Sequence, residues 1–239
     1  MSPPATDTPP VADVALIAGA SLVPAAALLP DAALQPAAAR LPDAASLIGR
    51  ADSAGRLWRP AELAGRLCEL ASDPHGVHLT LACALIRSFQ QAAEPAAWVT
   101  ASRATFFPPD AAHGGVDLAA LPVVTVPGPE AVLSVAERLT RCGSFGLIVL
   151  ELGTHLAVPA AVLGRLARLA RRHDTALLCL TTSKSETTLG SLVALRGRGF
   201  RTATRHPGYF HCGIRVIKDR RHGPGGSLAV ACHAPYGMC

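Results

Sequence analysis

Aromatic residues are scarce in this sequence, at 4% of 239 residues, although half of all residues are apolar. Much of that apolar content is alanine. Such a composition favours helices packed on a parallel sheet and argues against an all-β sandwich. The length fits one domain of ordinary α/β size with an appended segment, and a core of that size needs no disulfide or metal to fold.

Paired cysteines are also missing, because the seven cysteines are scattered and form no Cys-x-x-Cys pair. We therefore expect no disulfide framework and a reducing cytosol as the compartment. A Gly-x-Ser-x-Gly elbow is absent as well, so Ser/His/Asp hydrolase chemistry is not expected. The late histidines and cysteines fit no structural zinc spacing, and we expect no metal site among them. These residues are His206, His211, Cys212, Cys232, His233 and Cys239.

The N-terminal stretch lacks the features of a secretory leader or a membrane span. No basic residue precedes the apolar residues 14–30, whereas a secretory signal begins with positive charge. Pro24 and Pro30 break that stretch, so it is unsuited to crossing a bilayer. We expect a soluble cytoplasmic protein that associates with the nucleoid and with no membrane.

Positive charge is scarce in the first two thirds of the chain and concentrated in the last third. Residues 1–160 carry 9 Lys/Arg against 14 Asp/Glu, a net charge of −5. Residues 161–239 carry 13 against 3, a net charge of +10. This asymmetry favours a basic face that meets a polyanion such as nucleic acid, although a merely solvated basic face fits the same numbers.

Three regions differ in composition. Residues 1–60 are rich in alanine and proline, and we expect short helices, turns and partial disorder there. Residues 61–226 are predicted to form the core domain, and residues 227–239 a C-terminal tail. Hydrophobic patterning predicts strands at 66–71, 97–101, 122–126, 146–152, 176–182 and 213–218, and helices at 79–92, 130–142 and 158–173.

The predicted strands are apolar without alternation, as in Leu147-Ile148-Val149-Leu150. Both faces of such strands must be covered, which is typical of parallel sheets between two layers of helices. Strands that alternate with helices therefore predict an α/β fold with a mostly parallel sheet and right-handed crossovers.

The loop after the first of these strands lacks the lysine of a phosphate-binding loop. Such loops cradle phosphates with glycine-rich backbone and neutralise them with a lysine, followed by a Ser/Thr that holds Mg²⁺. Here residues 71–80 keep Gly76 and Thr80, but His78 stands in the lysine position. His78 is shorter than lysine and mostly neutral at pH 7. Asp73 adds a negative charge where a phosphate would lie, so tight triphosphate binding is not expected.

Seven segments resemble RecA recombinases, in order, between residues 65 and 222. The first, Gly65-Arg66-Leu67-Cys68-Glu69-Leu70, is similar to the strand that leads into the RecA phosphate loop. Residues 97–102 resemble the strand that ends in the catalytic glutamate, residues 115–118 the turn before the third strand, and residues 142–151 the Walker B strand. Residues 177–182 resemble the strand of the nucleotide-sensing glutamine, residues 185–190 the second DNA-binding loop, and residues 215–220 a late basic strand.

This resemblance implies a RecA-like core, but the hydrolytic residues differ. Ser102 stands where RecA proteins have the catalytic glutamate, and Thr182 replaces the sensing glutamine. Glu151 is an acceptable Walker B residue without a loop lysine to act with. Together with Gly76, His78 and Thr80, these residues form a vestigial nucleotide site. We therefore expect no catalytic residue, no cofactor and no ATP hydrolysis.

The family with this profile is ImuA, which is related to RecA and to the SulA cell-division inhibitors. The ending Arg220-Arg221-His222-Gly223-Pro224-Gly225-Gly226 resembles that of ImuA proteins. Membership implies an accessory role in the SOS mutasome for error-prone translesion synthesis. The implied partners are an ImuB-like homologue of Y-family polymerases, an error-prone replicative-type polymerase, RecA and single-stranded DNA. Two alternatives are a SulA-type inhibitor of a tubulin-like GTPase and a divergent P-loop ATPase.

Basic residues near and after the second DNA-binding loop are the candidates for contact with DNA or a partner. The region has few aromatic residues for base stacking, so binding would be electrostatic and salt-sensitive. The candidates are Lys184, Arg196, Arg198, Arg201, Arg205, Lys218, Arg220 and Arg221.

Overall fold

The computed structural model describes residues 21–28, 58–72, 76–101, 106–153, 158–182, 189–203 and 209–233. In these ranges nine strands form one sheet, in the order β1-β4-β3-β5-β6-β2-β7-β8-β9. The strands are β1 (Ser21–Pro24), β2 (Leu67–Ser72), β3 (Ala96–Thr100), β4 (Pro122–Thr125), β5 (Leu147–Gly153), β6 (Ala176–Thr182), β7 (Leu195–Ala203), β8 (Tyr209–Asp219) and β9 (Ser227–His233). The six strands from β4 to β7 in this order pair in parallel, while β1, β8 and β9 are antiparallel to their neighbours. The expected α/β fold with a mostly parallel sheet is confirmed.

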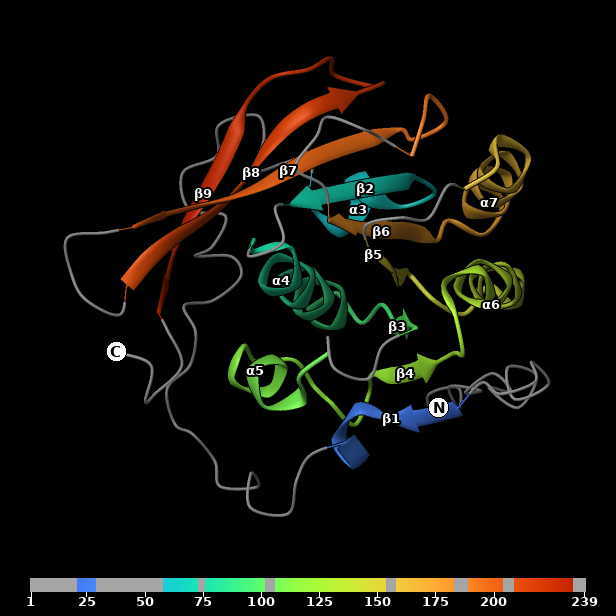
Figure 1. Ribbon diagram of the computed structural model, residues 1–239, viewed down its shortest axis with the longest axis horizontal. Helices are drawn as coiled ribbons and strands as arrows, with labels where there is room; N and C mark the ends of the chain where they lie inside the picture. Colours follow the sequence, from blue (N-terminus) through green and yellow to red (C-terminus); the bar gives the residue numbers. More distant parts are fainter. Residues whose placement is uncertain are drawn as a thin grey trace, which may run out of the picture.

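Helices cover both faces of the parallel strands (Figure 1). The helices are η2 (Ala25–Leu28, a 3-10 turn), α3 (Pro60–Leu63), α4 (His78–Gln91), α5 (Pro108–His113), α6 (Pro129–Cys142) and α7 (Ala160–His173). One core contains Leu63 of α3, Phe89 of α4 and Ala111 of α5. The core on the opposite face contains Leu139 of α6 and Leu166 of α7. The strands between these layers are buried on both sides, which is why they read as unbroken apolar runs.

The six predicted strands and three predicted helices all occur, with their ends shifted by a few residues. The ends follow local backbone chemistry. Pro129 begins α6, and Gly143 ends it with a left-handed φ of 69° that glycine adopts without strain. Asp174 ends α7 with a φ of 51°.

Three observed strands were not predicted. β7 contains two glycines and three arginines in nine residues, and Phe200 and Thr202 alone supply the usual aromatic and β-branched signal, which is therefore weak. β9 pairs with β8 over residues 227–233, which the sequence analysis assigned to a tail. β1 pairs with β4 inside the segment for which we expected only short helices and turns. Each of these strands is fixed by its partner strand rather than by its own pattern.

Close packing explains one of the two glycines of β7. A Cβ at Gly197 would lie 2.5 Å from Ile214 Cγ2 and 2.6 Å from Trp58 Cζ2. At Gly199 a Cβ would make only ordinary contacts, with Val77 and Leu81 at 3.4 Å. The Trp58 ring and the start of α4 therefore pack on the same strand, and Gly197 leaves room for the ring.

Within the described ranges, no helix combines the length and apolar character that a membrane crossing requires.

Candidate functional site

The vestigial site lies at the carboxyl ends of the central parallel strands. β2 leads toward α4 at this edge, and β6 is inserted between β2 and β5. Cross-strand pairing places Ser72 beside Thr182 and Thr100 beside Glu151. Ligands of open α/β sheets bind at this edge. The sheet thus brings Glu151, Thr182 and the start of α4 together. Ser102 lies outside the described residues.

His78 is the first residue of α4 and is buried, with 7% of its surface exposed. Burial lowers the pKa of His78, because the imidazolium form would lose its hydration. The side chain is therefore neutral at physiological pH. It supplies no positive charge in the position where a phosphate-binding lysine is required.

Two buried polar atoms on either side of residues 73–75 have no hydrogen-bond partner among the residues that the structure describes. They are the Ser72 Oγ at the end of β2 and the His78 Nδ1 at the start of α4. Buried groups without partners are rare in folded proteins and are frequent at functional positions. Gly76 is half-buried, whereas Thr80 is exposed on the first turn of α4.

The carboxylate of Glu151, the residue at the Walker B position, accepts a hydrogen bond from inside the fold. Trp98 on β3, which is fully buried, donates a hydrogen bond from Nε1 to the Glu151 Oε2 over 3.3 Å. With a neutral His78 at the start of α4, the position of the phosphate-binding lysine supplies no positive charge at this edge. The described residues of this edge do not fit a magnesium nucleotide, and we derive no chemical step through one.

Glu69 on β2 is fully buried and has polar contacts with β6, β7 and Leu189. It accepts hydrogen bonds from the Thr181 hydroxyl at 3.1 Å and the Leu189 amide at 3.3 Å. Arg196 Nε on β7 lies 3.4 Å from its Oε2. Burial raises the pKa of Glu69, and Arg196 and the two hydrogen bonds oppose that effect. Glu69 therefore links β2 to Thr181 of β6, to Leu189 and to Arg196 of β7.

Arg196 is a correction to the predicted binding surface. It is only 6% exposed and faces Glu69, so it is not available to a phosphate or a partner. A buried charge remains ionised only when it is paired, and this pairing uses the guanidinium inside the fold.

Arg66, the second residue of the RecA-like strand motif, is also buried in an ion pair. It donates to Asp219 at the end of β8 and to the Ala194 carbonyl at 3.1 Å. Asp219 further accepts hydrogen bonds from the Arg221 amide and the His222 Nδ1, each at 2.9 Å. Burial alone would raise the pKa of Asp219, but these donors outweigh it and the pKa lies below its ordinary value. The pair fastens the start of β2 to the end of β8.

The remaining predicted basic residues separate into two groups along β7 and β8. Lys218 and Arg220 both donate a hydrogen bond to the Ser191 carbonyl. Arg221 Nη1 lies 3.8 Å from Glu62 Oε2. These three residues form the group at the sheet edge opposite to residues 71–80. Arg201 is exposed toward the other edge and covers the Phe210 ring at 3.9 Å. Arg198 lies between the groups, half-buried and directly across from Arg215. Lys184 and Arg205 lie outside the described residues.

Four residues with a role in the structure were not predicted from the sequence. Arg66, Glu69 and Asp219 form buried ion pairs, and Arg215 is an exposed arginine of β8. A signal existed for Glu69, because a carboxylate inside a strand buried at every position needs a buried cation. Its partner was not predictable, since Arg196 is 127 positions away and belongs to an unpredicted strand.

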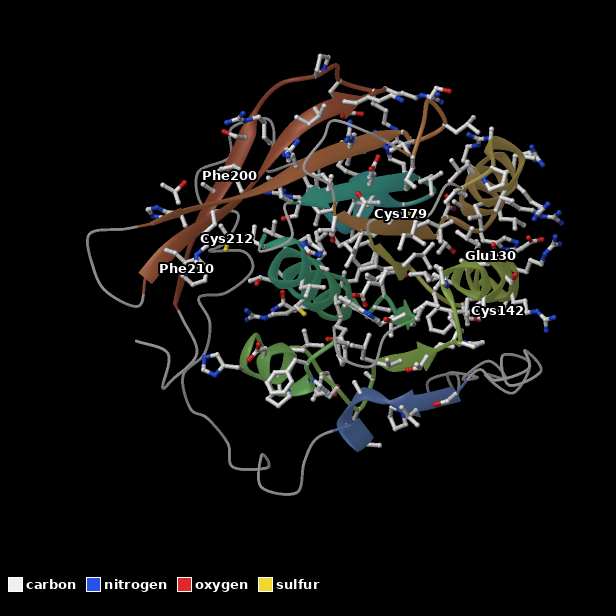
Figure 2. All side chains as sticks on the ribbon, in the orientation of Figure 1. Glu130, Cys142, Cys179, Phe200, Phe210 and Cys212 are labelled. Carbon is white, nitrogen blue, oxygen red and sulfur yellow. The ribbon has the colours of Figure 1, made fainter. Side chains whose placement is uncertain are left out.

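Among the described residues, no group of three or more His, Cys, Asp or Glu side chains is placed to hold a metal ion. His211 is exposed, whereas its neighbour Cys212 packs with Phe210 in the core on the α4 face (Figure 2). Successive strand residues point to opposite faces, so these two do not converge on one ion.

Comparison with known proteins supports the fold. No protein-family model matches the chain, and no curated protein matches it. The crystal structure of the RadB recombinase is similar, with a TM-score of 0.52 and 17% sequence identity over 70% of this chain and 86% of that one. At this identity the similarity establishes a RecA-like fold and no more.

Proposed function

We propose that the chain is a non-hydrolysing, RecA-like accessory protein that acts in DNA-damage tolerance by binding other macromolecules. The observation that carries this proposal is His78, a buried and neutral side chain at the position of the phosphate-binding lysine. The resemblance of the motifs to ImuA favours the error-prone translesion synthesis mutasome of the SOS response. The RecA-like fold, which it shares with a recombinase, is consistent with work at damaged DNA.

Four partners follow from this proposal: an ImuB-like homologue of Y-family polymerases, an error-prone replicative-type polymerase, RecA and single-stranded DNA. The residues proposed to meet DNA or a partner are Arg201, Arg220 and Arg221, which are exposed, and Arg198 and Lys218, which are half-buried. Their guanidinium and ammonium groups suit phosphates or carboxylates.

ATP turnover by the purified full-length chain tests the first half of the proposal. With Mg·ATP and single-stranded DNA, we expect phosphate release no faster than from buffer and no binding of a fluorescent ATP analogue. The variant His78→Lys is expected to remain inactive, because Ser102 provides no general base. Turnover at the rate of an active RecA protein would make the chain a divergent ATPase instead.

Partner capture tests the second half. The tagged chain should retain the purified Y-family homologue in a pull-down, with or without nucleotide. Failure to bind it, combined with cell filamentation on overexpression without DNA damage, would favour the SulA-type alternative.

A further inference from the structure

The outer face of α7 is a row of arginines. Leu163, Leu166 and Ala170 pack into the core, and the opposite side of the helix faces solvent. Arg165, Arg168 and Arg172 are all exposed on that side, spaced by three and four residues. Residues at this spacing are neighbours about 5–6 Å apart at Cβ, so the three form one continuous row. The helix contains no acidic residue.

The neighbouring helix α6 extends this basic face. Arg138 and Arg141 are exposed on α6, and Glu137 lies between the two helices. One Glu137 oxygen is 2.7 Å from Arg141 and the other is 2.7 Å from Arg165. Two of the five arginines on these helices, Arg141 and Arg165, therefore share the single Glu137 carboxylate. In Figure 2, nitrogen-tipped side chains project from the outer sides of α7 and of α6, the helix that carries the labelled Glu130 and Cys142.

Stability of the fold does not account for this row. Among the described residues, no carboxylate pairs with Arg168 or Arg172. Like charges four residues apart on a helix destabilise it. The C-terminal dipole favours a cation at Arg172 in the last turn, but Arg168 lies before that turn. Repulsion among these arginines therefore destabilises α7 in the isolated chain, and a negatively charged partner would relieve that repulsion.

The chemistry of the face distinguishes a protein partner from a nucleic acid. Neither α6 nor α7 contains an aromatic residue on which bases would stack. A helix with carboxylates at the same three- and four-residue spacing would instead place one carboxylate against each arginine, and guanidinium pairs with carboxylate in a bidentate manner.

We propose that the outer face of α6 and α7, centred on Arg165, Arg168 and Arg172, docks an acidic helical segment of a partner protein whose carboxylates recur every three to four residues. This inference rests on the proposed partner-binding function and specifies one surface for it. It is a separate surface from the basic residues of β7 and β8.

Fluorescence anisotropy with the full-length chain tests the docking face. The probe is a labelled, alanine-rich helical peptide with glutamates at positions i, i+4, i+7 and i+11, at low salt. We expect binding that weakens at high salt, and a loss of at least tenfold in affinity for Arg168→Glu with Arg172→Glu. A scrambled peptide of equal charge should bind several-fold more weakly, because its carboxylates do not face the row. Equal binding of both peptides, or no effect of the double variant, would overturn the proposal.

A matched control and a charge swap exclude trivial explanations. The control Arg59→Glu with Arg215→Glu carries the same charge change just before α3 and on β8, and it should retain most of the peptide affinity. A peptide with lysines in place of the glutamates should bind the Arg168→Glu, Arg172→Glu variant and not the parent chain. Restored binding shows that the variant is folded, and its absence would count against the face.

Two further readouts separate this inference from the proposed function. If the α7 double variant lowers affinity for a single-stranded oligonucleotide and leaves the peptide affinity unchanged, the face binds nucleic acid and the proposal is wrong. If the peptide does not bind but the Y-family homologue is still captured, the docking face is wrong while the proposed function stands.

Discussion

At the scale of single residues, the contacts of two glycines predict opposite effects of the same change. Gly197 faces Ile214 and Trp58 so closely that a Cβ would overlap both side chains. A Cβ at Gly164, inside α7, would meet Leu192 and Arg168 at ordinary distances of 3.7 and 3.8 Å. We expect Gly197→Ala to lower the free energy of unfolding by about 1–3 kcal/mol through overpacking.

Gly164→Ala should raise the free energy of unfolding by about 0.5–1 kcal/mol, because alanine loses less conformational freedom in a helix. Urea denaturation of both variants measures the two effects. An equal loss in both would mean that Gly164 is also under steric constraint.

His78 predicts a pH dependence of stability. Its pKa is lowered by burial in the fold, while the unfolded chain takes up this proton near the ordinary histidine pKa of 6.5. The unfolded state therefore binds more protons below that pH, and stability is lost as the pH falls from 7 to 5. We expect His78→Leu to remove at most about 2 kcal/mol of this pH-dependent loss. Chemical denaturation of both proteins at the two pH values measures the difference, and parallel pH profiles would contradict it.

At the scale of elements, two buried ion pairs join β7 and β8 to β2, in addition to the parallel pairing of β7 with β2. Arg66 joins the start of β2 to Asp219, and Glu69 joins the middle of β2 to Arg196. Arg66 and Glu69 both belong to the strand motif of residues 65–70 that resembles RecA. In this chain the motif connects the phosphate-loop strand to the basic strands, so its charged residues stabilise the architecture.

Removing one partner of the first pair should be costly. Arg66→Met leaves the Asp219 carboxylate, whose side chain is fully buried, without its cation. We expect a loss of about 3–5 kcal/mol in the free energy of unfolding. The double variant Arg66→Met with Asp219→Leu should recover a large part of that loss, since no uncompensated charge remains. A double-mutant cycle in urea measures the coupling, and additive losses would exclude it.

The pairing of β9 predicts the effect of shortening the chain. A chain ending at residue 226 lacks β9, which pairs with β8 from Arg215 to Tyr209. β8 would then be an exposed edge strand, and such edges promote association between chains. We expect the shortened protein to melt at a lower temperature and to aggregate on heating, as measured by light scattering. An unchanged melting curve would show that β9 contributes little to the fold.

At the scale of the whole molecule, the positive charge of the last third of the chain is divided among several surfaces. Part of it is used in buried ion pairs, part lies along β7 and β8, and part lies on α7. Polyanion binding is therefore expected to involve only the exposed groups. Titration of a labelled single-stranded oligonucleotide should show affinity that falls steeply with salt.

Removing the charge of one exposed arginine tests whether that residue contacts the oligonucleotide. Arg215→Ala is expected to weaken binding and to lower the salt slope by about 1 if it contacts one phosphate. No binding at low salt would restrict the basic strands to protein partners. Equal affinity of the variant and the parent would exclude Arg215 from the DNA contact.

The sequence by itself determined the fold class, the central strands and the main helices. Apolar runs such as Leu147–Leu150 have one stable solution, burial between two helical layers. The sequence also determined that lysine is missing from the phosphate loop, because that depends on residue identity alone. It did not indicate β1, β7 or β9, whose residues lack a strand pattern and pair because a neighbouring edge is available.

Only the tertiary structure decided which charged side chains are buried inside the fold. Arg196 and Arg198 look alike in sequence, yet Arg196 is buried against Glu69, whereas Arg198 is half-buried and lies across from Arg215. The Glu151 carboxylate likewise accepts a hydrogen bond from the Trp98 indole. The role of a charged side chain depends on the dielectric and the partners around it, and the partners of Arg196 and Glu151 come from residues more than fifty positions away in the chain.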